Sequence, residues 1–137
     1  MQYALLFYQT PEEFAARADP KKREAFWASF VPYMKALNDA GIVVAGAGLE
    51  PPDVATSIRL IGGKRQVQDG PYAEAKEQLA GFFIIDVANL DVALEWGARY
   101  PGGPNRGVEV RPVLPPTDRE KMLNVAGRQD AGARAVQ

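Results

Sequence analysis

Apolar positions in this chain fall into short runs typical of strands and into two longer stretches with helical periodicity. Residues 3–8 form an aromatic, apolar run bounded by Gln9-Thr10-Pro11, which predicts a buried and central strand. From Pro20 to Ala40, apolar side chains recur at steps of three and four, which predicts an amphipathic helix that Gly41 ends. Pro32 lies within this pattern, so we expect the helix to bend or restart there. The apolar stripe of this helix consists of Phe26, Phe30, Tyr33, Met34 and Leu37.

The rest of the chain predicts a hairpin, two further strands, a second helix and a final strand. Residues 42–49 indicate a strand, and residues 56–61 indicate another that turns at Gly62-Gly63 into residues 65–68. Residues 82–87 form a continuous apolar strand, and Asn89 caps a helix that runs to about Tyr100. The last strand is expected over residues 108–113, with Val108 and Val110 on one face and Glu109 and Arg111 on the other. The inner stripe of the second helix is expected to be Leu90, Ala93, Leu94 and Ala98.

This order of elements predicts an α+β fold, namely a ferredoxin-like split βαβ sheet with an added hairpin and two helices on one face. The other face of the sheet needs a cover, so we expect a homodimer in which two sheets meet and enclose a barrel-like cavity. One domain is expected over residues 1–116, because a chain of this length rarely holds two. Residues 117–137 form a polar tail. Its segment Thr117-Asp118-Arg119-Glu120 has capping-box spacing for a short helix to about Ala126, and we expect the end to be disordered.

The composition excludes several partners and kinds of active site, but it does not identify a reaction. The 137 residues hold 16 Lys and Arg against 17 Asp and Glu, without a basic cluster among aromatic residues, so nucleic acid is not an expected partner. The chain has no Cys and no His, which excludes disulfides, zinc sites built on these residues and every triad that needs imidazole. We find no spacing of oxygen ligands, and we expect neither a metal nor another cofactor. No apolar run approaches the length of a membrane span, so we expect a cytoplasmic protein.

The segment Asp69-Gly70-Pro71-Tyr72 predicts a rigid corner, because Gly tolerates backbone angles closed to other residues and Pro fixes its own φ angle. A carboxylate held there is a candidate general base if the fold buries it, and the alternative is that Asp69 merely caps a turn. Tyr72, Glu74 and Lys76 are candidate ligand-binding residues after the corner. The alternative for these charges is a solvated face or ion pairs that stabilise a dimer.

Charged residues on the predicted strands form a second set of candidates. Glu109 and Arg111 share the strand face that we expect to line the cavity. Arg111 or Arg59 would hold a carboxylate or enolate through its planar guanidinium group, with Glu109 orienting the Arg or acting as a base. An ion pair across the dimer is the alternative. Tyr8 is a candidate wall of a ligand pocket, together with Tyr3, Tyr33, Trp27 and Trp96, although core packing is the common role of aromatic residues at such spacings.

Several segments together resemble the DGPF-domain proteins of the YCII-related family, over residues 3–114. The resemblance implies a dimeric α+β barrel and a relationship to small isomerases and monooxygenases that need no cofactor, although the group has no established reaction. Some members are associated with extracytoplasmic-function sigma factors. The segments that carry the resemblance are Gly62-Gly63, Asp69-Gly70-Pro71-Tyr72, Glu74, Lys76-Glu77-Gln78-Leu79, Gly81-Phe82, Ala93-Leu94-Glu95-Trp96 and Val108-Glu109-Val110-Arg111-Pro112.

The chain departs from the family pattern in two ways. Tyr72 stands where the motif has Phe, which keeps the ring and adds a hydroxyl group. The His–Asp pair proposed for other YCII-like proteins has no counterpart here, since the chain lacks His. Two hypotheses remain. In the first, a homodimer binds a small anionic or carbonyl-bearing molecule; if it is catalytic, it is an isomerase or lyase that needs no cofactor and transfers a proton with Asp69 or Glu109 as base. In the second, the protein is a non-catalytic accessory module whose Asp69 loop builds the dimer or contacts a regulatory protein.

Overall fold

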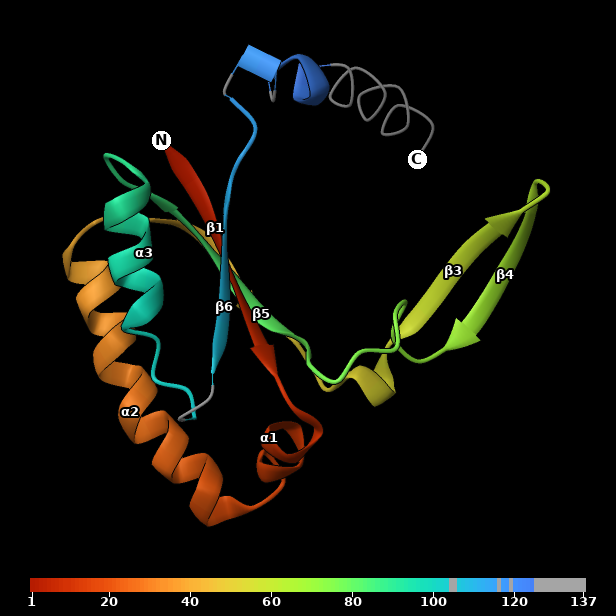
Figure 1. Cartoon of the computed structure of the whole chain (residues 1–137), viewed down its shortest axis with the longest axis horizontal. Helices are drawn as coiled ribbons and strands as arrows, with labels where there is room; N and C mark the ends of the chain where they lie inside the picture. Colours follow the sequence, from red (N-terminus) through yellow and green to blue (C-terminus); the bar gives the residue numbers. More distant parts are fainter. Residues whose placement is uncertain (104–105, 116, 119, 125–137) are drawn as a thin grey trace, which may run out of the picture.

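A computed structural model describes residues 1–103, 106–115, 117–118 and 120–124. Four strands form an antiparallel sheet in the order β2-β5-β1-β6, which is the arrangement of a ferredoxin-like α+β fold (Figure 1). Helices α2 and α3 cover one face of this sheet. The predicted fold class is therefore confirmed. The sheet and its connections comprise β1 (Gln2–Gln9), α1 (Pro11–Ala16), α2 (Pro20–Asp39), β2 (Val43–Gly48), β5 (Gln78–Asp86), α3 (Leu90–Ala98) and β6 (Gly107–Pro112).

Helix α2 runs without interruption through Pro32, so the predicted restart is wrong. Asp19 caps its first turn, because its carboxylate accepts hydrogen bonds from the backbone N–H groups of Lys21 and Lys22. Tyr33 and Leu37 are buried, as the predicted stripe requires. Packing of this stripe on the sheet offsets the backbone hydrogen bond that proline cannot make.

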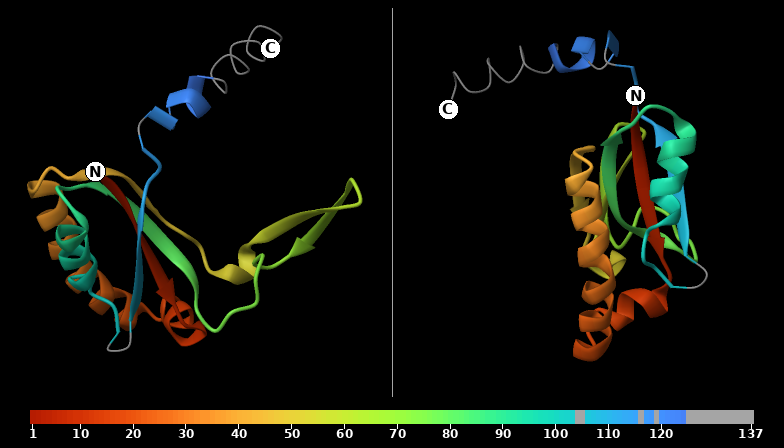
Figure 2. Two further views of the ribbon diagram at one scale, coloured as in Figure 1. Left: turned by 45° about the horizontal axis from the view of Figure 1, so that its top comes forward. Right: turned by 90° about the vertical axis from the view of Figure 1, so that its left-hand side faces the viewer.

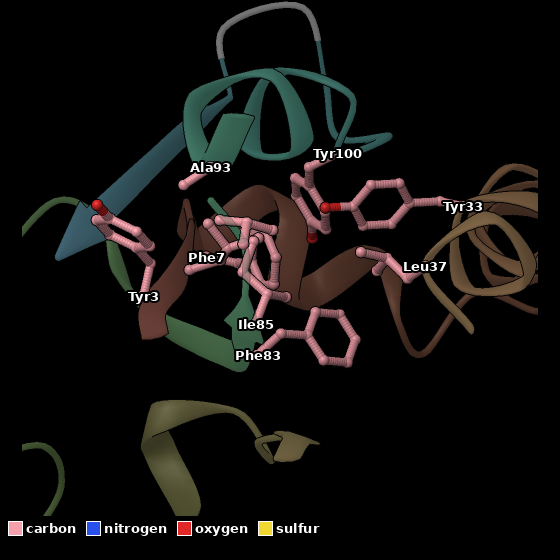
Figure 3. Packing of buried hydrophobic residues seen from close by; sticks show 10 residues of the cluster. Tyr3, Phe7, Tyr33, Leu37, Phe83, Ile85, Ala93 and Tyr100 are labelled. Carbon is pink, nitrogen blue, oxygen red and sulfur yellow. The ribbon is translucent and has the colours of Figure 1, made fainter. Parts of the chain in front are cut away.

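The central strand β1 sets the two faces of the sheet, since its buried residues alternate with partly exposed ones. Tyr3, Leu5 and Phe7 point to the helices and join a core that also contains Leu37 and Ile85 (Figure 3). Residues between them, such as Leu6, point to the opposite face, which we call the open face. No helix covers this face in the part of the chain that the structure describes (Figure 2).

Helix α3 buries a different stripe from the one predicted. Ala93 and Gly97 are buried, whereas Leu90 and Leu94 remain 46% and 48% exposed. The reason is a close approach to β6: a Cβ atom at Gly97 would lie 3.4 Å from the side chains of Val108 and Val110. Small residues therefore face the sheet, and the large leucines point away. The prediction that Val108 and Val110 share one face of the last strand is confirmed, since both pack against the core beneath the helices.

The predicted hairpin is present as a separate two-stranded sheet of β3 (Thr56–Ile61) and β4 (Lys64–Asp69). Gly62 and Gly63 form its turn with positive φ angles of 57° and 76°, which side chains with a Cβ atom rarely adopt. Figure 1 shows that the hairpin projects from the body on the side away from the helices. A short 3₁₀ turn (Pro52–Val54) leads into it.

The C-terminal segment is helical over residues 117–118 and 120–124. The Arg119 and Ala126 positions of the predicted helix, and the end of the tail, lie outside the described residues. Among the helices that the structure describes, none is long and apolar enough to cross a membrane.

Burial of the Tyr33 phenol predicts a loss of stability at high pH. Its hydroxyl donates a 2.8 Å hydrogen bond to the backbone carbonyl of Trp96, and burial raises the pKa of Tyr33 to about 12 from 10.0. The unfolded chain therefore loses this proton above pH 10, while the folded chain holds it until about pH 12. We expect wild type to lose roughly 2 kcal/mol more stability than Tyr33→Phe over this window in urea unfolding experiments. Tyr72→Phe, at an exposed site, is the control, and equal pH profiles for Tyr33→Phe and wild type would contradict the assignment.

Candidate functional site

The corner at Asp69 forms at the end of β4. Gly70 adopts a φ angle of 101°, its N–H donates to the carbonyl of Ala55 over 2.7 Å, and its own carbonyl accepts a 2.7 Å bond from the Ser57 hydroxyl. The corner is thus held by the base of the hairpin. Asp69 itself is exposed, so the desolvation that a carboxylate base would draw on is missing in a single chain.

Arg59 and Tyr72, two of the predicted ligand-binding residues, contact each other. The guanidinium group donates to the Tyr72 hydroxyl over 3.3 Å and to its backbone carbonyl over 3.0 Å. It also lies 4.1 Å from the centre of the Tyr72 ring, in cation–π geometry. This contact ties the loop after the corner to β3. Arg59 therefore has a partner within the chain, and its role in ligand binding stays a prediction.

Other predicted residues gather on the open face. Tyr8, Lys76 and Glu109 line an open depression beside Gly107, and Glu109 forms an ion pair with Arg111. Arg111 is exposed on the same face of β6, as the alternation predicted. Glu74 lies in the exposed loop before β5. The structure thus brings together Tyr8, Lys76, Glu109 and Arg111, while Asp69, Arg59 and Tyr72 lie at the hairpin.

A larger cavity lies on the opposite side of the sheet, where α1 and the first half of α2 approach β2 and β5. Its volume is about 900 Å³, and we call it the aromatic pocket. Trp27, at its mouth, is 51% exposed, which shows that the pocket opens to solvent. Asp69, Arg59, Tyr72 and the predicted residues of the open face do not line it. The aromatic residues that line it from the helices and the helical face of the sheet are Phe7, Phe26, Trp27, Phe30, Phe83 and Tyr100.

Polar groups meet at one end of the aromatic pocket. Gln9 is only 7% exposed, and its side-chain oxygen accepts a 3.1 Å hydrogen bond from Arg17. Arg17 also donates to the backbone carbonyls of Leu49 and Ala80, which bridges β2 and β5 at this end of the sheet. Tyr100 completes the group: burial raises its pKa, while its hydrogen bond with Gln9 acts to lower it.

Two local features of the sequence build this end. Thr10 and Glu13 form a reciprocal capping box, and Pro11 stands in the first turn, so that α1 begins immediately after β1. This places Glu13 and Arg17 beside Gln9. On the opposite wall, Gly46 lacks a side chain where a Cβ atom would lie only 2.2 Å from the Phe83 ring.

Sequence reasoning missed the aromatic pocket, although parts of it carried a signal. The spacing of Thr10 and Glu13 is that of a capping box, the same signal that was applied to the C-terminal tail. Trp27 was named among candidate pocket aromatics, and the structure places it at the mouth. Arg17 and Gln9 gave no local signal, because their partners are distant in sequence.

The fold and these sites define a ferredoxin-like α+β protein with an aromatic pocket between its layers. The sequence model of the YCII-related domain matches residues 1–117. A curated relative, the uncharacterized protein R00369 of Rhizobium meliloti (strain 1021), is 35% identical over 115 residues, which are 82% of this chain and 92% of the relative. The chain therefore belongs to the YCII-related family.

Arg17 is expected to stabilise the pocket end of the fold. Arg17→Met keeps much of the apolar stem and removes hydrogen bonds to three acceptors, on Gln9, Leu49 and Ala80. We expect the free energy of unfolding in urea to fall by about 1.5 kcal/mol, the size typical of a hydrogen bond to a charged group. Arg23→Met, at an exposed position on α2, serves as the matched control. Equal stabilities for the two variants would show that these bonds exchange with water at no cost.

Proposed function

We propose that this protein is a homodimer that binds a small organic molecule in the aromatic pocket. The observation that carries this proposal is the pocket itself, which combines a volume of about 900 Å³, aromatic walls and a few polar groups at one end. Ligand sites in proteins have this composition and lie near this size. The sequence predicted a ligand cavity on the open face of the sheet. We now propose the aromatic pocket, on the helical face, as the ligand site.

Charges around the aromatic pocket favour an anionic or carbonyl-bearing ligand. Arg17, Lys22 and Arg23 line it, against Glu13 and Glu50. The excess of cations attracts electron-rich groups toward the mouth. Proton transfer with Asp69 or Glu109 as base, and with Arg111 or Arg59 as stabilising cation, stays a prediction for residues outside this pocket. Asp69 and Arg59 lie at the hairpin, whereas Glu109 and Arg111 lie on the open face.

A second copy of the chain is the proposed cover of the open face. Leu6 and Ile84 are partly exposed there, and the hairpin exposes Ile58, Leu60 and Val67 to 56%, 73% and 55%. A two-stranded hairpin is only marginally stable in water, so an arm with these apolar side chains gains stability from a cover. Pairing of two open faces would bury both surfaces and preserve twofold symmetry.

The second candidate function is a non-catalytic module that contacts a regulatory protein, such as one associated with a sigma factor. The exposed apolar hairpin favours it, because the same side chains would fit a protein partner. The two functions differ in what they require of the aromatic pocket. Only the first needs the pocket to be occupied.

A variant that fills the aromatic pocket tests the ligand site. Small molecules that raise the thermal stability of the purified protein are first selected from a metabolite library. Ala16 lines the pocket from α1, and its neighbour Ala15 is exposed outside the lining. We expect Ala16→Trp to raise the dissociation constant of a selected ligand at least about tenfold, or 1.4 kcal/mol, with little change in Ala15→Trp. If the screen selects no ligand, or if both variants change the dissociation constant equally, the results would favour the second candidate function, contact with a regulatory protein.

Dimer formation is tested by placing a charge on the open face. Leu6→Asp buries an unpaired carboxylate in the proposed interface, so we expect sedimentation velocity to show a monomer where wild type is a dimer. Leu94→Asp, on the outer side of α3, should remain dimeric. Leu60→Asp on the hairpin gives a second test that does not involve the sheet, and circular dichroism checks folding. If the wild-type protein is a monomer at micromolar concentrations, the homodimer proposal is wrong.

A further inference from the structure

Tyr100 is the most firmly positioned polar side chain of the aromatic pocket. It follows α3, is 4% exposed, and stacks on Phe7 with ring centres 4.1 Å apart and an interplanar angle of 21° (Figure 3). The rings of Phe30 and Tyr33 meet it edge-on at 6.3 and 6.2 Å. Because the ring is held on two sides, the direction of its hydroxyl group is set before any ligand arrives.

The surroundings of this hydroxyl favour a neutral phenol that donates a hydrogen bond. Burial raises the pKa of Tyr100 and Glu13 raises it further, while Gln9 and Arg17 act in the opposite direction. The phenol therefore keeps its proton at neutral pH. The side-chain oxygen of Gln9 already accepts a hydrogen bond from Arg17, so we take the Gln9 amide N–H as the group that faces the phenolic oxygen. This arrangement leaves the phenolic proton for another acceptor.

The same end of the pocket is poorly suited to a carboxylate. Arg17 directs its hydrogen bonds at Gln9, Leu49 and Ala80, and its positive charge is opposed at Tyr100 by the charge of Glu13. Glu13 adds a negative charge beside Tyr100, where it would repel a bound anion. A neutral acceptor is therefore favoured at this position, while any anionic group of a ligand is better placed at the mouth near Lys22 and Arg23.

We propose that the aromatic pocket recognises flat aromatic molecules with a neutral carbonyl group, and that Tyr100 donates the hydrogen bond to the carbonyl oxygen. The rings of Phe26, Phe30 and Phe83 offer stacking surfaces to the aromatic part. This inference rests on the proposed ligand site and narrows its ligand class from anionic or carbonyl-bearing molecules to neutral carbonyl compounds. Tyr100 is a specificity-determining residue in this assignment.

Two probes of the same shape test the inference in the full-length protein. 2-Acetylnaphthalene carries a carbonyl oxygen where 2-isopropenylnaphthalene carries a methylene group. We expect wild type to bind the ketone about tenfold more tightly in calorimetric titrations, because one hydrogen bond to a buried donor separates the two. Tyr100→Phe should bind both probes equally. Tyr33→Phe is the matched control, since it removes a hydroxyl from the same cluster that is bonded to Trp96, and the preference should persist.

Infrared spectroscopy provides a second measurement that needs no variant. A hydrogen bond from Tyr100 should lower the carbonyl stretching frequency of the ketone bound to wild type, relative to the ketone in hexane. An unshifted frequency, or equal binding of both probes to wild type, overturns the role of Tyr100 while leaving the ligand site in place. Tighter binding of 2-naphthoate than of the ketone overturns the neutral ligand class. If no probe binds, and Ala16→Trp leaves the dissociation constant of the screened ligand unchanged, both the proposed ligand site and this inference are wrong.

Discussion

Stacking of Tyr100 on Phe7 is the contact on which both the layering of the fold and the aromatic pocket depend. Phe7 belongs to the central strand β1, and Tyr100 follows α3 directly. Two rings of α2, Phe30 and Tyr33, meet Tyr100 at its edges. The Tyr100 ring therefore contacts the sheet and α2 at once, and it holds the end of α3 against both. Because Phe7, Phe30 and Tyr100 also line the aromatic pocket, the rigidity of this cluster carries over to the site.

The space between helices and sheet is closed at one end and hollow at the other. At the closed end, Leu5, Leu37 and Ile85 are fully buried, with small residues of α3 pressed against β6. At the other end, Arg17 joins strands through backbone carbonyls instead of filling the space. Gly46 contributes no side chain there. The hollow is therefore bounded by hydrogen-bonded backbone and rigid rings, which is the kind of wall that keeps a cavity open.

Local patterns were sufficient to predict the strands, the hairpin and the two main helices, because each of these elements depends on neighbouring residues. The sheet arrangement followed from matching the order of these elements to a known fold. Local patterns failed for the inner stripe of α3, since periodicity shows which residues share a face but not which face meets the sheet. Gly97 and Ala93 face inward because β6 lies close to the helix. The aromatic pocket was beyond prediction for a related reason: Arg17 binds acceptors 32 and 63 residues away in the chain. Helix α1 has only six residues, so its capping box is a stronger signal than its periodicity.

The two faces of the sheet leave room for a ligand on one side and a partner chain on the other. The aromatic pocket lies on the helical face, and its mouth at Trp27 is formed by α2, away from the open face. Pairing of open faces would therefore cover Leu6 and the hairpin while the pocket stays accessible. The strands still connect the faces mechanically, because β1 alternates between them residue by residue. Phe7 faces the pocket and Tyr8 the open face, so a shift of β1 on one side must displace side chains on the other.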